Sequence, residues 1–106
     1  GLGFNGGELL HLAVAACVSN DLFREASGAG IRLDTVRVAV RGDFAGDPAV
    51  STGIHYDLGV TGDADEERLQ ALVARVDRIA EIPQSLRQGT RVGIGRTTAR
   101  RSSSGS

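Results

Sequence analysis

The first quarter of the chain holds a long apolar run. Residues 9–18 read LLHLAVAACV, with His11 as the one strongly polar position. Asn5 suits a helix N-cap and Glu8 follows at capping-box spacing, so the pattern predicts a helix over about residues 6–26, ended by two nearby glycines. Because the run is apolar on every face, this helix is expected to be buried on all sides.

The next segment alternates with period two. Residues 32–41 place three valines on one face and arginines on the other, and residues 54–60 alternate again. Residues 42–51 contain Gly, Asp and Pro and are interpreted as a connection. The pattern therefore predicts an antiparallel hairpin that is covered on one face only.

A second amphipathic helix follows the hairpin. Asp63 is its predicted N-cap, with Glu66 at the capping-box position, and Pro83 ends it and begins a short helix over residues 83–88. The apolar stripe of the second helix consists of Leu69, Leu72, Val73, Val76, Ile79 and Ala80.

The chain ends in two segments of different character. Residues 90–94 are expected to be extended and to add an edge strand, whereas residues 96–106 are rich in Arg, Ser and Thr and are expected to be disordered. The predicted fold class is α+β, in the order α-β-β-α-(short α)-β. Two or three strands cannot cover an apolar helix, so this chain needs further surface, from residues before Gly1 or from a second subunit.

Composition narrows the possible functions. The 106 residues suffice for one domain, and the low aromatic content of 4% favours oligomerisation. A net charge of −1 argues against nucleic acid as an obligate partner, and a single cysteine excludes an internal disulfide and a multi-cysteine metal site. The apolar run is too short to span a bilayer and lacks a basic leader. We therefore expect a cytoplasmic protein without membrane contact, metal or cofactor.

The segment Asn5-Gly6-Gly7-Glu8-Leu9-Leu10, followed by Ala15-Ala16-Cys17, resembles the N-P-E-x-L … A-A-C pattern of the OsmC/Ohr family of thiol-dependent hydroperoxide reductases. The order of the predicted elements agrees with this resemblance. Pro83 agrees as well, because the family carries a second cysteine in a C-P pair at the end of its second helix. The resemblance predicts one OsmC-like domain over residues 1–95.

The resemblance implies an intertwined homodimer with two long central helices. In the family, a cysteine on this helix attacks the peroxide and becomes a sulfenic acid, the C-P cysteine condenses with it, and external dithiols reduce the disulfide. A Glu at the helix start and an Arg from an N-terminal strand organise the site. The corresponding catalytic candidates here are Cys17 and Glu8.

Three positions depart from the family pattern. Ile82 precedes Pro83, so the second cysteine is absent. The family's Glu stands ten residues before the cysteine, where this chain has Gly7; Glu8 stands nine before, which turns it by roughly 100° around the helix. The family's N-terminal strands, with their Arg, would precede Gly1.

Two functions remain open for Cys17. If its thiol is reactive, the chain is a one-cysteine reductase of small hydrophobic peroxides that depends on an external thiol. The alternative is a catalytically degenerate dimer that binds a small hydrophobic ligand at the subunit interface, with Cys17 as a packing residue. Reactivity requires a nearby cation, and along the helix Arg24 lies two turns away, so that cation is expected to come from elsewhere. An RNA-binding module is a third reading, based only on element order and the Arg-rich tail.

Overall fold

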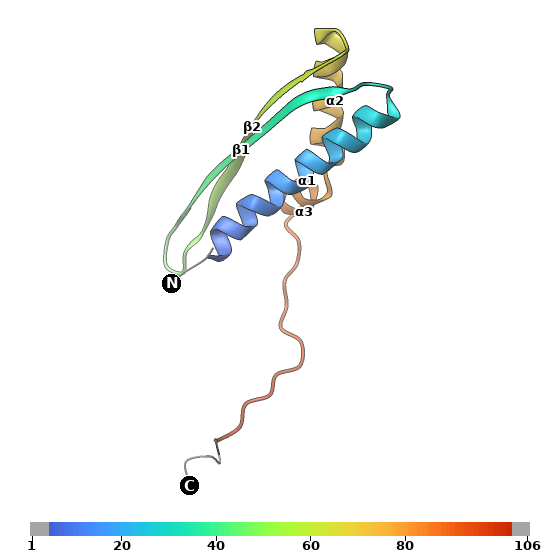
Figure 1. Cartoon of the computed structure of the whole chain (residues 1–106). Helices are drawn as coiled ribbons and strands as arrows, with labels where there is room; N and C mark the ends of the chain where they lie inside the picture. The colour runs from blue at the N-terminus through green and yellow to red at the C-terminus, as the bar shows by residue number, and fades with distance from the viewer. Residues whose placement is uncertain (1–4, 103–106) are drawn as a thin grey trace.

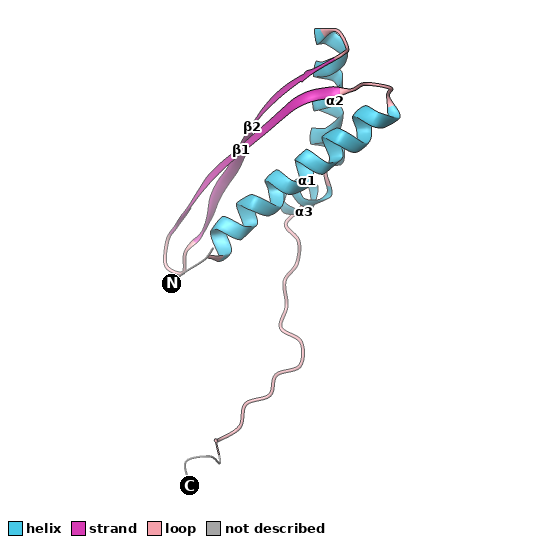
Figure 2. Ribbon diagram, viewed as in Figure 1, coloured by secondary structure: helices cyan, strands magenta, loops and turns pink. Residues whose placement is uncertain are grey.

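The computed structural model describes residues 5–102 as three helices and a two-stranded antiparallel sheet (Figures 1 and 2). Residues 103–106 of the predicted tail lie outside the described part of the chain. The elements in chain order are α1 (Gly6–Gly28), β1 (Leu33–Ala45), β2 (Val50–Gly62), α2 (Glu66–Ile79) and α3 (Glu81–Arg87).

The hairpin β1–β2 is longer than the alternation predicted. Val38 pairs with Leu58, and pairing continues to Ala45 opposite Val50, past an irregularity after Asp43. The expected connection over residues 42–51 is therefore mostly strand, and the turn is confined to residues 46–49. The strands continue through this polar segment because each added pair of residues satisfies backbone N–H and C=O groups of both strands. As Figure 1 shows, α1 runs along this hairpin.

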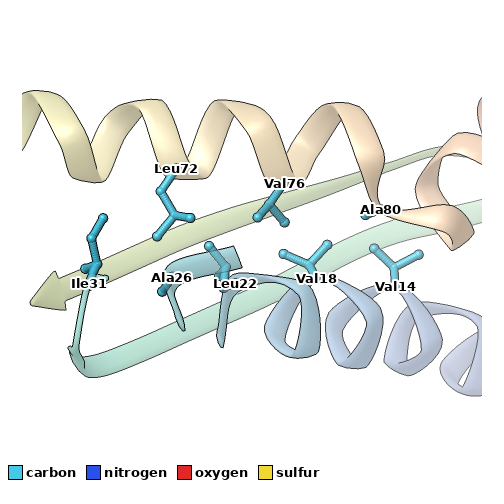
Figure 3. Packing of buried hydrophobic residues seen from close by; sticks show 8 residues of the cluster. All are labelled: Val14, Val18, Leu22, Ala26, Ile31, Leu72, Val76 and Ala80. Atoms are coloured by element: carbon cyan, nitrogen blue, oxygen red, sulfur yellow. The ribbon is translucent and has the colours of Figure 1, made fainter. Parts of the chain in front are cut away.

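The core lies where α1, α2 and the inner face of the hairpin meet (Figure 3). On α1 the buried apolar side chains recur every four residues, so they form one narrow stripe that faces α2 and the sheet. Val18, Leu22 and Val76 have no exposed surface. The complete buried cluster consists of Val14, Val18, Leu22, Ala26, Ile31, Leu72, Val76 and Ala80.

Two predicted caps had different outcomes. The Asn5 side chain accepts a hydrogen bond from the Glu8 N–H at 2.8 Å, which confirms the cap of α1. The predicted cap of α2 was wrong by two residues: Asp65 accepts from the Arg68 N–H at 2.8 Å. Asp63 instead accepts from the Arg32 N–H at 2.7 Å and fastens the start of β1 to the end of β2. Local spacing along the sequence could not predict this hydrogen bond, because its two residues lie 31 positions apart.

The opposite face of α1 is exposed in the single chain, so this chain alone does not provide the burial on all sides expected of the helix. Leu9 and Leu12 are each 50% exposed and Phe23 is 54% exposed. Together with exposed Ala16 they form what we call the α1 stripe, with spacings of three, four and seven residues. One chain therefore covers only one face of its longest helix. No helix within residues 5–102 is long and apolar enough to cross a membrane.

The predicted edge strand over residues 90–94 is absent from the sheet. Gly89, with φ of +68°, follows α3, and the chain then leaves the body of the molecule (Figure 1). Val92 and Ile94 are 90% and 86% exposed. Alternation favours an extended backbone, but a strand also requires an edge to pair with, and the end of α3 directs this segment away from both edges.

Candidate functional site

Cys17 lies on α1 between the buried face and the α1 stripe, and its free thiol is partly exposed. It opens onto a cavity of about 320 Å³, which we call the thiol cavity. The other residues that line the thiol cavity are Asn20, Asp21 and Arg24 from α1, Ile79 from α2, and Glu81 and Ile82 from α3. The residue that carries the single thiol of the chain thus lines a space large enough for a small molecule.

Ile82 lies in the same cavity as Cys17 although 65 residues separate them. Both side chains are partly buried and pack against the core cluster. Ile82 occupies the sequence position at which the resemblance placed a second cysteine. The structure therefore brings the two positions of the resembled cysteine pair together, with an apolar side chain in place of the second thiol.

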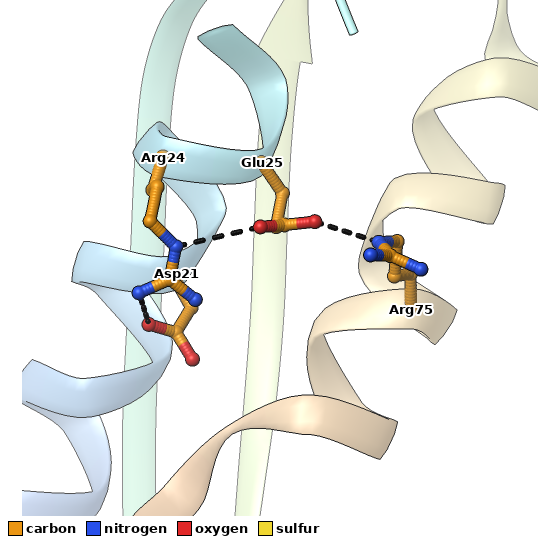
Figure 4. A network of polar contacts seen from close by, with 4 residues as sticks. All are labelled: Asp21, Arg24, Glu25 and Arg75. Carbon is orange, nitrogen blue, oxygen red and sulfur yellow. Dashed lines mark hydrogen bonds and ion pairs between the residues drawn. The ribbon is translucent and has the colours of Figure 1, made fainter. Parts of the chain in front are cut away.

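Arg24 also lines the thiol cavity, which the spacing along the helix did not suggest. Its Nη1 lies 3.0 Å from Oδ1 of Asp21, so the long side chain reaches back by one turn (Figure 4). Arginine has a long flexible stem, and the i,i+3 pairing with Asp21 was the signal that could have revealed this. The expectation that the cation activating Cys17 comes from elsewhere stays a prediction.

The charge of Arg24 is shared with two carboxylates. Asp21 is only 7% exposed, and Glu25 Oε2 lies 3.4 Å from Arg24 Nε (Figure 4). Glu25 also accepts a hydrogen bond from Arg75 at 2.6 Å, which links α1 to α2. The hydrogen bond from Arg75 is the main reason that the pKa of Glu25 is lowered, against the opposing effect of burial. The thiol cavity therefore has a cation at its rim that is held by ion pairs.

Glu8, the second catalytic candidate, is exposed at the start of α1 and does not line the thiol cavity. Nine residues of helix place it about 13.5 Å along the axis from Cys17. A catalytic role for Glu8 in an assembly stays a prediction. At the neighbouring Gly7, a Cβ atom would lie 2.7 Å from Cε2 of Phe44, so a larger side chain would displace that ring.

His11 is packed under the tip of the hairpin. Its ring stacks on Phe44, with centroids 6.0 Å apart and planes inclined by 23°. Its Nε2 is buried and has no hydrogen-bond partner among residues 5–102. A Cβ atom on Gly42 would lie 2.8 Å from this nitrogen, so glycine is required there for the packing. Within the described residues, no group of three His, Cys, Asp or Glu side chains could hold a metal ion.

A second polar cluster joins β2, α2 and α3. The Tyr56 hydroxyl donates a hydrogen bond to Asp77 Oδ1, and Arg87 Nη2 donates to the same oxygen at 2.7 Å. Arg87 Nη1 donates to the Asp77 carbonyl at 2.8 Å and to Gln84 Oε1 at 2.7 Å. Sequence reasoning missed this cluster, because Tyr56, Asp77 and Arg87 lie 10 to 31 residues apart and carry no motif.

The cluster shifts the ionisation equilibria of its charged and phenolic members. Burial, followed by the hydrogen bond to Asp77, raises the pKa of Tyr56 to about 12. The hydrogen bonds from Tyr56 and Arg87 lower the pKa of Asp77. Asp77 is therefore ionised and Tyr56 neutral throughout the physiological range.

Alkaline titration should resolve Tyr56 cleanly, because it is the only tyrosine and the chain has no lysine. In the folded protein, the midpoint of the near-ultraviolet tyrosinate absorbance should lie at about pH 12, and in urea near the reference value of about 10. The unfolded chain loses this proton first, so the contribution of Tyr56 to stability is present below pH 10 and is lost as the pH rises towards 12.

The Asp77→Asn variant should move this midpoint part of the way towards the reference value, because it removes the charged acceptor but leaves the burial. Asp57→Asn, on the same strand as Tyr56, removes an exposed carboxylate that pairs with Arg41 at 3.6 Å and should leave the midpoint unchanged. A midpoint that is equal in wild type and Asp77→Asn would contradict the assigned cause.

The fold and the thiol site define a class: an α+β domain with one long helix that carries a partly exposed cysteine beside an antiparallel hairpin. The family model described as "OsmC-like protein" matches residues 1–95. The chain belongs to the OsmC-like family. None of the curated proteins compared with the chain matches it.

Solved structures share the fold at low identity. The OsmC-like protein from Mycoplasma pneumoniae superposes with a TM-score of 0.74 at 18% identity, over 85% of this chain and 66% of that one. An OsmC-like hydroperoxide resistance protein from Jannaschia sp. CCS1 gives 0.72 at 18% identity, over 90% and 70%. An organic hydroperoxide resistance protein OsmC from Legionella pneumophila gives 0.60 at 21% identity, over 82% and 64%. The chain spans about two thirds of the length of these structures.

Proposed function

We propose that the chain is a one-cysteine, thiol-dependent hydroperoxide reductase that acts through Cys17. The observation that carries this proposal is the partly exposed thiol at the wall of the thiol cavity, with Arg24 at the rim. Family membership and the hydroperoxide resistance proteins among the similar structures support the same chemistry. Ile79 and Ile82 give the thiol cavity an apolar side that suits an organic peroxide.

The proposed cycle uses one sulfur atom. The Cys17 thiolate attacks an oxygen of ROOH, an S–O bond forms, the O–O bond breaks, and the alkoxide leaves and takes a proton as ROH. The sulfur is oxidised by two electrons to a sulfenic acid. An external thiol then displaces water to give a mixed disulfide, and a second thiol releases Cys17 and leaves as the external disulfide. In this proposal Arg24 orients the peroxide or stabilises the leaving alkoxide.

Consumption of cumene hydroperoxide with excess dithiothreitol tests this function. Wild type should turn over, and Cys17→Ser should fall to the rate without protein. The double variant C17S/S27C carries one exposed thiol further along α1 and should remain inactive, because Ser27 does not line the thiol cavity. Equal rates for wild type and C17S/S27C would show that any exposed thiol suffices and would refute a site at Cys17.

The second candidate function is ligand binding by a catalytically degenerate dimer. It is favoured by Ile82 in place of a second thiol and by the ion pairs of Arg24 with Asp21 and Glu25, which engage the cation that lines the thiol cavity. This function predicts no turnover in wild type, and binding of a hydrophobic ligand that Cys17→Ser does not change. The same assay therefore separates the two functions.

We further propose that the protein is a homodimer in which the α1 stripes of two chains face each other. The stripe has the three- and four-residue spacing of a helix seam, and Ala16 at its middle allows close approach. Leu9, Leu12 and Phe23 expose about half of their surface in one chain, and a second copy would remove that surface from water. Cys17 borders the stripe, so the partner would form part of its surroundings.

A further inference from the structure

A second cavity, separate from the thiol cavity, lies between the first half of α1, the first half of β2, and α3. Its volume is about 450 Å³, and we call it the β2 cavity. Its walls are mostly apolar: Leu10, Val14, Ile54, Pro83 and Leu86. Neither Cys17 nor any charged residue of the thiol cavity lines it. The proposed reductase chemistry therefore does not use this space.

The polar groups of the β2 cavity stand apart along the strand. Tyr56 and Arg87 line one part of it, and Ser51 and Thr52 line another. Five residues separate Ser51 from Tyr56, which corresponds to roughly 17 Å of strand. The cavity is thus elongated, with an apolar wall and a phenol and a guanidinium at one end.

The guanidinium of Arg87 is held in place and still has donors to offer. Its three hydrogen bonds, two to Asp77 and one to Gln84, use both hydrogens of Nη1 and one of Nη2. Nε–H and the second Nη2–H donate to neither Asp77 nor Gln84, although the guanidinium also interacts with the Tyr56 hydroxyl. Nε–H and Nη2–H form the pair of donors that a carboxylate accepts in a bidentate bond.

The local charge favours an anion. Asp77 offsets the charge of Arg87, but Arg78 also lies close enough to lower the pKa of Asp77. Two guanidinium groups and one carboxylate leave a net charge of about +1 at this end. The Arg87 side chain is 47% exposed, so a ligand headgroup can reach it without opening the core.

We infer that the β2 cavity binds a small monocarboxylate with an apolar body, of the size of a medium-chain fatty acid. The carboxylate pairs with Nε and Nη2 of Arg87, and the chain lies along Leu10, Val14 and Leu86. Tyr56 holds Asp77, which in turn fixes the guanidinium. This site is independent of Cys17 and of the proposed reductase function.

Titration calorimetry with octanoate, at concentrations below its micelle formation, tests the site. One octanoate should bind per chain. Octanol should bind at least about tenfold more weakly, because it lacks the charge-assisted pair. Arg87→Lys keeps the charge but loses the bidentate geometry, and it should weaken octanoate by about tenfold. Arg75→Lys makes the same change on α2, outside the cavity, and should leave the affinity unchanged.

Several outcomes would overturn the site. Equal affinity for octanoate and octanol would show that the headgroup is not recognised, and equal affinity of wild type and Arg87→Lys would remove Arg87 from it. If octanoate protects Cys17 from an alkylating reagent, the ligand lies in the thiol cavity. Absence of saturable binding would leave the β2 cavity as surface covered by a second copy or by another segment of a longer chain.

Discussion

Ile82→Cys is expected to form a disulfide with Cys17 after one equivalent of hydroperoxide. Ile82 and Cys17 line the same cavity and both pack against the core, so the introduced thiol lies where it can attack a sulfenic acid on Cys17. The variant should lose two hydrogens by mass spectrometry and stop there. Wild type has no second thiol in the chain and should instead progress to sulfinic acid as the peroxide dose rises.

The disulfide should also raise the thermal stability of the Ile82→Cys variant. A cross-link over 65 residues lowers the entropy of the unfolded chain and is worth roughly 4 kcal/mol in the loop-closure model. The oxidised variant should therefore unfold at a clearly higher temperature than its reduced form. Ser85→Cys is the matched control, because Ser85 also lies on α3 but does not line the thiol cavity. Equally fast internal disulfides in both variants would mean that chain mobility, and not the cavity, brings the thiols together.

The elements built from local periodicity could be predicted from the sequence. The long apolar run and Asn5 determined α1, and the alternating valines determined the hairpin, because these patterns depend on neighbours within one turn or one strand. Asp63 shows the limit. It satisfies the local rule for a cap, yet a bond to the Arg32 N–H, 31 residues away, holds it elsewhere.

The candidate site was predictable in part for the same reason. Cys17 and Ile82 were identified through a motif, and the fold then brought them to one cavity. The presence of Arg24 in the thiol cavity could not be inferred from its Cα position alone, because its side chain reaches back three residues to Asp21. The cluster of Tyr56 and Arg87 has no local signature, because tertiary packing alone brings its three elements together.

Leu12→Glu should convert the proposed dimer to monomers. In one chain Leu12 is 50% exposed, so the substitution should change the unfolding free energy of the monomer by about 0.5 kcal/mol or less. In a symmetric seam the same change acts twice. Because Leu12 is already half buried in one chain, dimerisation gains about 1 kcal/mol of apolar burial per copy, and its loss from both copies amounts to roughly thirtyfold in the dissociation constant.

Sedimentation velocity over a range of protein concentrations measures this effect. Val92→Glu is the control, because Val92 is 90% exposed but lies outside the helices, so it places the same charge on an equally apolar position away from the α1 stripe. A dimer that survives Leu12→Glu, or one that Val92→Glu dissociates, would assign the interface to another surface. Because Cys17 borders the stripe, dissociation should also speed alkylation of its thiol, which ties the accessibility of the proposed catalytic sulfur to the assembly that covers α1.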